Sequence, residues 1–257
     1  MIWAMHAHLL QIDPAWEDAP TNFAAAAASA RLARPAPGDL VVLPEMFDTG
    51  FSMNVAKTTD RGATLDAMGA IASEHGVCVV GGRTVAGAAG KGRNVATAVG
   101  PGGEVLCEYT KCHPFTLGGE HLSFESGDGP RVFEWKGLRI APIICYDLRF
   151  PELFRRAMVM GAEAFVVIAC WPATRHAHWR ALLPARAIEN QAYVLGCNRS
   201  GSDPKLEYMG GSMAVSPTGE TLAETFERGS ILKVEVDPGA VRRWREKFPA
   251  WKDHRFI

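Results

Sequence analysis

Cys145 occupies the position in this sequence that is best suited to nucleophilic chemistry. The apolar stretch over residues 138–144 predicts a buried strand that ends at this cysteine, and a helix is predicted from about Pro151. A thiol on the sharp turn between a strand and a helix is exposed next to free backbone N–H groups, so one local feature supplies both a nucleophile and donors for an oxyanion. The alternative is a structural thiol in the core, which is the usual state of a single cysteine.

Glu45 and Lys111 also follow predicted strands and could act together with Cys145. Glu45 comes directly after a short β-branched run, and Lys111 ends a second strand-like run over residues 104–110. Side chains at three strand ends can meet at one edge of a sheet, where a carboxylate could take the thiol proton and an ammonium could hold a thiolate and later an oxyanion. Singly, Glu45 is well explained as a solvated loop acid and Lys111 as a surface lysine, but the three together form a complete set for acyl transfer.

The sequence contexts of these residues resemble the motifs of the nitrilase, or carbon–nitrogen hydrolase, superfamily. Its Glu-Lys-Cys triad corresponds to Glu45 in Leu-Pro-Glu-Met-Phe, Lys111 in Tyr-Thr-Lys-Cys-His and Cys145 in Cys-Tyr-Asp-Leu-Arg-Phe-Pro-Glu. Further similar segments are Gly-Glu-His-Leu at 119–122, Cys-Trp-Pro-Ala at 170–173 and Ala-Arg-Ala-Ile-Glu-Asn at 185–190. The last two are most similar to the omega-amidase branch, which removes ammonia from the terminal amide of small keto-acid amides, and the resemblance covers nearly the whole chain.

The resemblance implies a thiol amidohydrolase that converts the terminal amide of a small carboxylic acid into acid and ammonia through a cysteinyl thioester. Glu45 is then the general base, Cys145 the nucleophile, and Lys111 with the backbone N–H of Tyr146 the oxyanion donors. Glu120 resembles a second family carboxylate that orients Lys111 and the substrate amide; its alternative is an ordinary loop acid. We expect Lys111 to lower the pKa of the Cys145 thiol, and we expect no cofactor and no metal.

Recognition of a dicarboxylic amide requires a cation for the far carboxylate. Arg149 and Arg175 lie near suitable strand ends; we expect Arg149 to pair with Glu152 as scaffold, which leaves Arg175 as the candidate. Trp171 follows a buried strand and is expected either to wall the pocket or to pack in the core. Alternative substrates within the superfamily are deaminated glutathione, N-carbamoyl amines and simple aliphatic amides or nitriles. A different class of function is a catalytically inactive scaffold or binding subunit.

Two other patterns are weak signals for chemistry. His176 and His178 could be metal ligands, but they fall at a predicted helix start, where residues i and i+2 do not share a face. The glycine-rich segment 87–92 lacks the spacing and the Ser or Thr of a phosphate-binding loop, and it predicts a hairpin turn. No Gly-x-Ser-x-Gly motif is present, which argues against the common serine-hydrolase route.

Composition agrees with a soluble, globular enzyme. The 257 residues carry a formal net charge of −1, from 27 basic and 28 acidic side chains, so nothing favours nucleic acid or an anionic membrane as a partner. No apolar run approaches the roughly 20 residues of a membrane span, and the first residues lack the features of a signal peptide. The six cysteines show no paired spacing, which is typical of a protein of the reducing cytoplasm.

Alternating strand and helix patterns predict an α/β fold. Strands are predicted near 2–11, 39–43, 77–82, 94–99, 104–109, 131–144, 164–169, 192–197, 211–216 and 230–236, and helices near 15–33, 62–75, 151–160 and 177–191. The resemblance implies the more specific architecture, a four-layer αββα sandwich of the nitrilase type. We expect a single carbon–nitrogen hydrolase domain over residues 1–257, because no linker or repeat interrupts the pattern.

The C-terminal segment is rich in aromatic residues. Trp244, Phe248, Trp251 and Phe256 lie close together near the chain end. Aromatic side chains in a tail usually cover an apolar surface, and in the superfamily such tails help to build a dimer. We therefore expect a homodimer or a higher homo-oligomer, with residues of about 240–257 at the interface.

Overall fold

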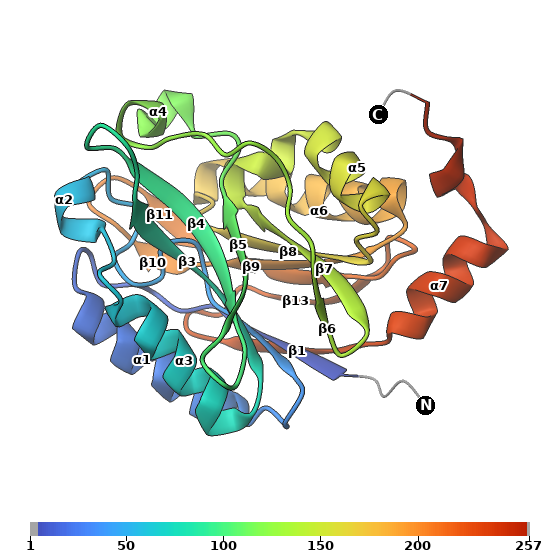
Figure 1. Cartoon of the computed structure of the whole chain (residues 1–257), viewed down its shortest axis with the longest axis horizontal. Helices are drawn as coiled ribbons and strands as arrows, with labels where there is room; N and C mark the ends of the chain where they lie inside the picture. The colour runs from blue at the N-terminus through green and yellow to red at the C-terminus, as the bar shows by residue number, and fades with distance from the viewer. Residues whose placement is uncertain (1–4, 256–257) are drawn as a thin grey trace.

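The computed structural model describes residues 5–255, which form two six-stranded sheets that pack face to face (Figure 1). The strand order of the first sheet is β14 (Ile231–Val236), β1 (Met5–Leu10), β2 (Leu40–Val42), β3 (Cys78–Ala86), β4 (Gly92–Val99) and β5 (Val105–Thr110). That of the second is β13 (Thr221–Thr225), β12 (Ser212–Val215), β9 (Tyr193–Asn198), β8 (Ala164–Ala169), β7 (Leu138–Ile144) and β6 (Phe133–Trp135). A separate hairpin pairs β10 (Ser200–Ser202) with β11 (Glu207–Met209).

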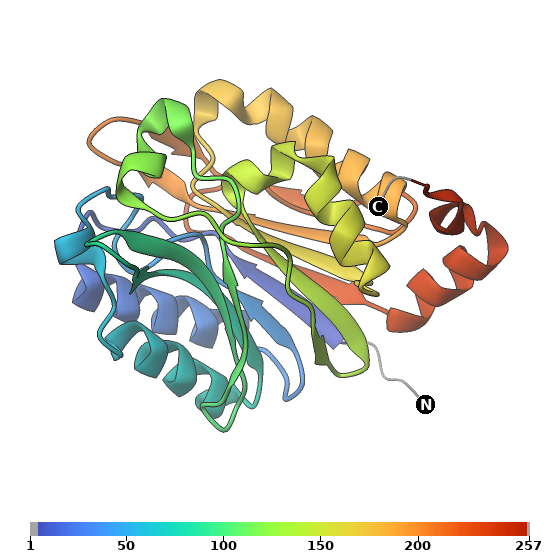
Figure 2. The same ribbon diagram turned by 45° about the horizontal axis from the view of Figure 1, so that its top comes forward.

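Helices cover the outer face of each sheet, which completes four layers (Figures 1 and 2). The long helices α1 (Ala19–Ala33) and α3 (Ala63–His75) cover the first sheet, and α5 (Pro151–Val159) and α6 (His176–Asn190) cover the second. The short helices are α2 (Val55–Thr58), α4 (Glu120–Ser123) and the 3₁₀ turns η1 (Thr116–Gly118), η2 (Cys145–Arg149), η3 (Ala173–Arg175) and η4 (Ala250–Asp253). The α/β class and the αββα sandwich expected from the sequence are therefore confirmed.

The apolar core has two parts, which lie on opposite faces of the first sheet. Side chains such as Leu9, Val42 and Ile144 fill the space between the sheets, and the same cluster continues under the helices of the second sheet. A separate cluster that includes Val41 and Met68 fills the space between the first sheet and helices α1 and α3. Strands buried on both faces read as continuous apolar runs, which explains why β2 and β8 were visible in the sequence.

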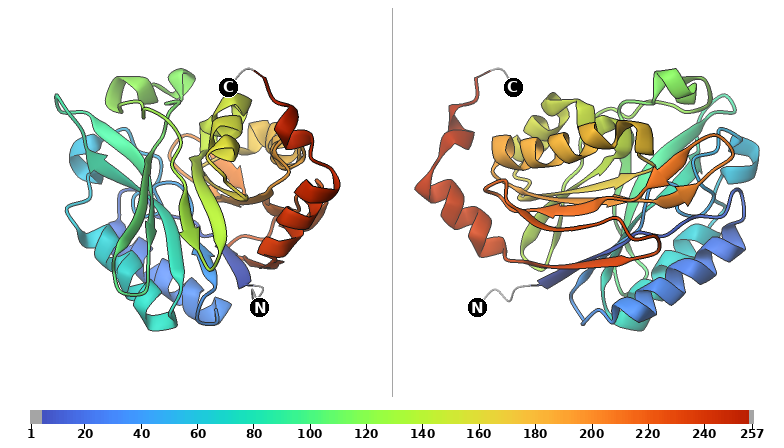
Figure 3. Two further views of the ribbon diagram at one scale, coloured as in Figure 1. Left: turned by 45° about the vertical axis from the view of Figure 1, so that its right-hand side comes forward. Right: turned by 180° about the vertical axis from the view of Figure 1, so that it is seen from behind.

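Several elements differ from the expectations, and the strands β10, β11 and β13 and the short helices α2 and α4 were not predicted. The segment 131–144 is not one strand but the hairpin β6–β7, in which Trp135 pairs with Leu138 across a two-residue turn. Lys136 and Gly137 have φ of 48° and 76°, the left-handed conformation that such tight turns require. The helix α7 (Pro238–Lys247) was also missed; it extends from the end of β14 along one side of the sandwich (Figure 3).

None of the helices within residues 5–255 has the length and apolar character that a membrane crossing requires. The glycine-rich segment after β3 is the turn of the antiparallel hairpin β3–β4, as its sequence predicted.

Parallel pairing brings the functional segments to one end of the sandwich. β1, β2 and β3 are parallel neighbours in the first sheet, and β7, β8 and β9 are parallel neighbours in the second. The segments that follow β2, β7 and β8 therefore leave their sheets at carboxyl ends, where ligands of α/β proteins commonly bind. The segment after β2 is fixed by backbone bonds to β3: the Gly82 N–H donates to the Pro44 carbonyl, and the Phe47 N–H donates to the Gly82 carbonyl.

Gly82→Ala should destabilise the protein, because a Cβ there would lie 2.4 Å from the Met46 nitrogen and 2.7 Å from the Glu45 Cα, neither of which can move freely. Overpacking of this kind costs about 1–3 kcal/mol. Gly69→Ala is the matched control: Gly69 lies within α3, its Cβ would meet only the Gly103 Cα at 3.8 Å, and alanine should stabilise the helix by about 0.5–1 kcal/mol. Denaturant unfolding of both variants measures the two effects, and equal stability of Gly82→Ala and wild type would contradict the close approach.

Candidate active site

Glu45, Lys111 and Glu120 form one buried ionic cluster. The Lys111 Nζ lies 2.8 Å from the Glu45 Oε1 and 2.8 Å from the Glu120 Oε2. All three side chains are at most 1% exposed. They come from the segments after β2 and β5 and from the first turn of α4, so the structure brings together three residues that are far apart in the sequence.

Asn94 connects the two carboxylates and was not identified from the sequence. Its Nδ2 donates to the Glu45 Oε1 at 2.8 Å and to the Glu120 Oε1 at 2.9 Å. An amide side chain within the mostly apolar run of β4 was the available signal, because a buried amide must find partners. The Phe115 N–H donates to the second Glu120 oxygen at 2.6 Å and completes the fixation of this carboxylate.

The cysteine that ends β7 stands on a strained turn. Cys145 has φ of 45°, a conformation that is uncommon for residues other than glycine and that marks stored strain at functional sites. It begins η2, so the backbone N–H of Tyr146 lies in a first helical turn, where such groups have no acceptor within the helix. The turn is exposed to the pocket on one side only, and Cys145 is 9% exposed.

Asp147 holds this turn in place and is a second residue that sequence reasoning missed. It is fully buried and accepts hydrogen bonds from the Tyr109 hydroxyl at 2.7 Å and from the His113 backbone N–H at 2.9 Å. Its Oδ1 also lies 2.8 Å from the His113 Nδ1, and its Oδ2 accepts from the Ile144 N–H at 3.4 Å. One carboxylate thus fixes η2 to the segments on both sides of Lys111.

The charges of the cluster decide its protonation. Burial alone would lower the pKa of Lys111, but Glu120 and Glu45 raise it well above its usual value, so the ammonium is kept. Burial and the Glu45 carboxylate raise the pKa of the Cys145 thiol well above its usual value, and Lys111 only partly opposes them. Lys111 thus acts in the expected direction and lowers the pKa of this thiol, but burial and Glu45 outweigh it, which favours the protonated thiol in the resting site.

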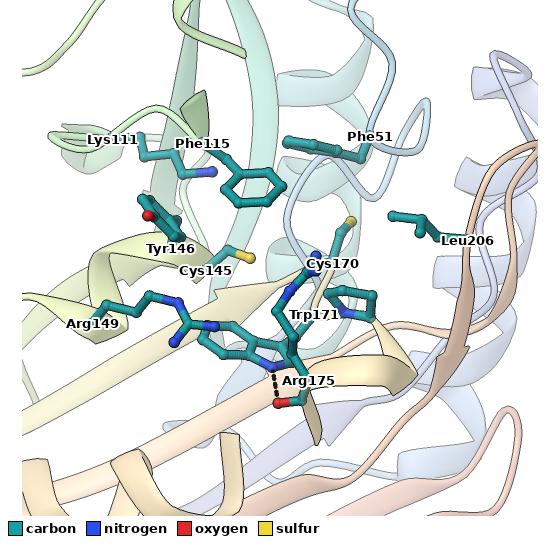
Figure 4. Close-up of a pocket in the computed structure, with 11 residues that line it drawn as sticks. Phe51, Lys111, Phe115, Cys145, Tyr146, Arg149, Cys170, Trp171, Arg175 and Leu206 are labelled. Carbon is teal, nitrogen blue, oxygen red and sulfur yellow. Dashed lines mark hydrogen bonds between the residues drawn. The ribbon is translucent and has the colours of Figure 1, made fainter. Parts of the chain in front are cut away.

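A pocket opens over Cys145 between the two sheets (Figure 4). It has an empty volume of about 380 Å³ including its open mouth. The site residues expected from the sequence that line it are Lys111, Cys145, Tyr146, Trp171 and Arg175. Arg149, which was considered as a substrate cation but expected to be scaffold, lines it too. The residues not expected at the site are Phe51, Phe115, Cys170, Pro172 and Leu206. Its walls are therefore aromatic, and its charged groups are cations.

Both pocket arginines are held by aromatic rings. The Arg149 guanidinium lies 4.7 Å from the Trp171 ring centroid, and its Nη1 lies 3.1 Å from the His178 Nδ1. The Arg175 guanidinium lies 5.2 Å from the Phe115 ring centroid. The expected Arg149–Glu152 ion pair is not formed in residues 5–255, because the Arg149 side chain turns toward the pocket instead.

Trp171 is both a pocket wall and a fixed part of the core. Its ring is 2% exposed, and its Nε1 donates to the Arg175 carbonyl at 2.8 Å, the bond drawn in Figure 4. Its backbone N–H donates to the Asn198 Oδ1 at 2.7 Å. The two alternatives considered for this residue therefore hold together, and the indole places the η3 turn that carries Arg175.

The described residues contain no group of three His, Cys, Asp or Glu side chains placed to hold a metal ion. His178 contacts Arg149, whereas the His176 ring packs 5.3 Å from the Phe226 ring, so the two histidines have separate surroundings.

An αββα sandwich with a buried Glu-Lys-Glu cluster beside a strained thiol defines a hydrolase of the nitrilase type. The chain belongs to the carbon-nitrogen hydrolase family, which it matches over residues 7–246. It is 39% identical over 252 residues to the omega-amidase YafV of Escherichia coli, with 95% of this chain and 94% of that protein covered. It is 36% identical over 220 residues to the 2-oxoglutaramate amidase of Bacillus subtilis, with 84% of this chain and 85% of that protein covered.

The solved structures agree with this assignment. A CN-hydrolase superfamily protein from Xanthomonas campestris, with an arsenic adduct in its active site, superposes with a TM-score of 0.92 at 32% identity and covers 99% of this chain and 98% of its own. This protein is therefore a hydrolase that acts on the carbon–nitrogen bonds of amides, in the omega-amidase branch.

Lys111→Met should lower the free energy of unfolding by about 3–5 kcal/mol at neutral pH, because it leaves two buried carboxylates without their cation. Folding raises the pKa of Lys111. The Lys111 ammonium therefore stabilises the folded protein fully at any pH below the usual lysine pKa, and this stabilisation is lost only at strongly alkaline pH, above the pKa that Lys111 has in the folded state. The decrease in the free energy of unfolding caused by Lys111→Met should be smaller in acid, where the two carboxylates take up protons. Lys57→Met, which removes a 66%-exposed partner of Glu17, is the control and should cost at most about 1 kcal/mol. Similar losses in the two variants would contradict the buried cluster.

Proposed function

We propose that this protein hydrolyses the terminal amide of a small dicarboxylic acid monoamide, with 2-oxoglutaramate and 2-oxosuccinamate as the substrate class, to the dicarboxylate and ammonia. The observation that carries this proposal is the pair of pocket cations: among residues 5–255, neither Arg149 nor Arg175 has a carboxylate partner, although both line the cavity above Cys145. A guanidinium without an anion beside a nucleophile suits a substrate that brings its own carboxylate. The omega-amidase and 2-oxoglutaramate amidase relatives support the same class.

The first half of the reaction forms a thioester. The substrate amide carbon is attacked by the Cys145 sulfur while the thiol proton passes to Glu45, so no free thiolate has to exist in the resting site. The Lys111 ammonium and the Tyr146 backbone N–H stabilise the oxyanion. The tetrahedral intermediate then breaks its carbon–nitrogen bond, and ammonia leaves with the proton that Glu45 had accepted.

The second half returns the enzyme to its starting state. A water enters the place of ammonia, gives a proton to Glu45 and attacks the thioester carbonyl, and the acid leaves as Cys145 recovers its proton. Glu120 contacts both Lys111 and the Asn94 amide, which supports a positioning role for this carboxylate. No step uses a cofactor or a metal.

Cys145→Ala should abolish turnover and leave the fold intact, because it removes only the nucleophile. With a slowly hydrolysed amide, intact-protein mass spectrometry of the wild type should show an acyl adduct, and peptide mapping should place it on Cys145. Cys112→Ala is the matched control, since Cys112 lies outside the pocket, and it should still form the adduct. An adduct on Cys112 or Cys170 would refute the assignment.

Arg175→Met should reduce kcat/KM for 2-oxoglutaramate about ten- to a hundredfold, because a charge-assisted hydrogen bond contributes about 1.5–3 kcal/mol. A neutral amide of similar length should be affected far less. Arg180→Met is the control, because Arg180 forms an exposed ion pair with Glu224 away from the pocket. The assay is ammonia release. Equal wild-type kcat/KM for the acid amide and the neutral amide would remove the proposed substrate and leave a general aliphatic amidase.

The homodimer is also part of this proposal. Phe248 is 54% exposed, and its ring lies 5.6 Å from the tilted Trp244 ring, while Arg245 of α7 donates to the Ala162 carbonyl. The helix is thus fixed to the body of the molecule along one side of the sandwich (Figure 3), and the exposed Phe248 at its end supports residues of about 240–255 as an interface; Phe256 lies outside the described residues. The six cysteines, all free, support the reducing cytoplasm as its location.

Light scattering at micromolar concentration should give at least the mass of a dimer, and Phe248→Asp should shift it toward the monomer by placing a charge in the apolar contact. Leu117→Asp serves as the control, since Leu117 is also highly exposed but lies in η1, away from α7. A monomer mass for the wild type would contradict the proposed interface.

A further inference from the structure

The pocket contains a second thiol that the amidase mechanism does not use. Cys145 and Cys170 both line it, and Figure 4 shows both sulfur atoms at the cavity. The two residues follow the adjacent parallel strands β7 and β8, in which Ile144 pairs with Ile168. Ideal strand geometry, with neighbours about 4.8 Å apart and a rise of about 3.3 Å per residue, puts their Cα atoms roughly 6 Å apart. Disulfides span Cα distances of about 4.4–6.8 Å.

Cys170 is held at the same carboxylate that serves Cys145. Its backbone N–H donates to the Glu45 Oε2 at 2.8 Å, and its Sγ lies 3.2 Å from the Glu45 carbonyl oxygen, to which the thiol donates. The residue is 5% exposed, and the part of it that is accessible belongs to the pocket. Its sulfur is therefore fixed beside the reacting centre and not in a separate part of the core.

The other cysteines have no access to this centre. Among the six, only Cys145 and Cys170 line the pocket; Cys78 and Cys197 are fully buried in the core, and Cys107 and Cys112 lie elsewhere at intermediate exposure. An oxidised Cys145 therefore has one thiol within the cavity that could react with it.

We propose that Cys170 is the resolving thiol of a peroxide-sensitive switch, which captures oxidised Cys145 as a reversible disulfide and turns the amidase off. The proposal rests on the activation of Cys145 in the proposed function. A peroxide first oxidises Cys145: the sulfur attacks one peroxide oxygen, the O–O bond breaks, the thiol proton leaves through Glu45 with the second oxygen as water, and a sulfenic acid remains. The Cys170 sulfur then attacks the sulfenic sulfur, the S–O bond breaks, and the hydroxyl leaves as water with the Cys170 proton.

The surroundings of Cys170 suit a thiol that acts second. Burial and the Glu45 carboxylate raise the pKa of Cys170 well above its usual value, as they do for Cys145. The two thiols differ in geometry: the Cys170 thiol donates to the Glu45 backbone carbonyl, which cannot take up its proton, so Cys170 has no general base for a direct reaction with peroxide. It becomes reactive only toward an electrophilic sulfur placed next to it. The disulfide would prevent further oxidation of Cys145 to the sulfinic acid, which is not restored by thiols.

The experiment treats the purified enzyme with hydrogen peroxide, then with dithiothreitol, and expresses each activity relative to the same variant before treatment. In the wild type, oxidation should abolish activity, lower the intact mass by two hydrogen atoms and give a peptide in which Cys145 is cross-linked to Cys170. Dithiothreitol should restore most of the activity. In Cys170→Ser, whose hydroxyl can keep the bond to the Glu45 carbonyl, the loss should be largely irreversible, with two oxygen atoms added at Cys145.

Cys112→Ser is the matched control and should behave as the wild type. The Cys145–Cys170 cross-link in the oxidised wild type tests the proposal even if Cys170→Ser does not fold. Cys170→Ala provides a second variant for the activity measurement. A wild type without the Cys145–Cys170 peptide, or Cys170 variants that recover fully in dithiothreitol, would overturn the proposal. A failure of this kind alongside an acyl adduct on Cys145 would leave the amidase function intact, whereas absence of that adduct would count against the function itself.

Discussion

The burial of the Lys111 ammonium between two carboxylates is the constraint on which the remaining structure depends. An isolated charge cannot be taken out of water at acceptable cost, so each of Glu45, Lys111 and Glu120 is tolerated at zero or 1% exposure only while the others are in place. Because the three come from the end of β2, the end of β5 and the start of α4, the cluster can form only when the first sheet and the loop above it are correctly assembled. Folding and preorganisation of the site are thus the same event.

The first sheet supplies charged residues to the site, whereas the second sheet supplies a residue with a strained backbone. Cys145 adopts a left-handed conformation that costs free energy, and the Asp147 carboxylate offsets that cost through its bonds to Tyr109, His113 and the strand before the turn. Since Tyr109 and His113 flank Lys111 in the sequence, the anchor of the nucleophile and the anchor of the ammonium lie in one segment. The relative placement of thiol and cation is therefore set across the interface between the sheets.

The sequence predicted those features that local pattern encodes. Buried strands such as β2 and β8 are uninterrupted apolar runs, and the triad Glu45, Lys111 and Cys145 was identified because each residue directly follows or closely succeeds a strand. Asn94 could not be assigned a role, because nothing local says that two distant carboxylates lie beside β4. The Lys136-Gly137 turn was missed since lysine rarely adopts positive φ, and the direction of Arg149 depended on the ring of Trp171, which is distant in sequence.

The pocket combines two demands that oppose each other in most sites. The proposed mechanism uses a thiol that gives up its proton only when the substrate arrives, and burial together with the Glu45 carboxylate raises the pKa of Cys145, which favours the protonated thiol before then. Recognition of an acidic substrate needs positive charge nearby, which by itself would favour a free and oxidation-prone thiolate. The structure separates these demands: the Lys111 charge is neutralised by its two carboxylates, whereas Arg149 and Arg175, which have no carboxylate partner within residues 5–255, are held on aromatic rings in the walls of the pocket. In the proposed mechanism, charge that attracts the substrate is thereby kept distinct from charge that stabilises the transition state.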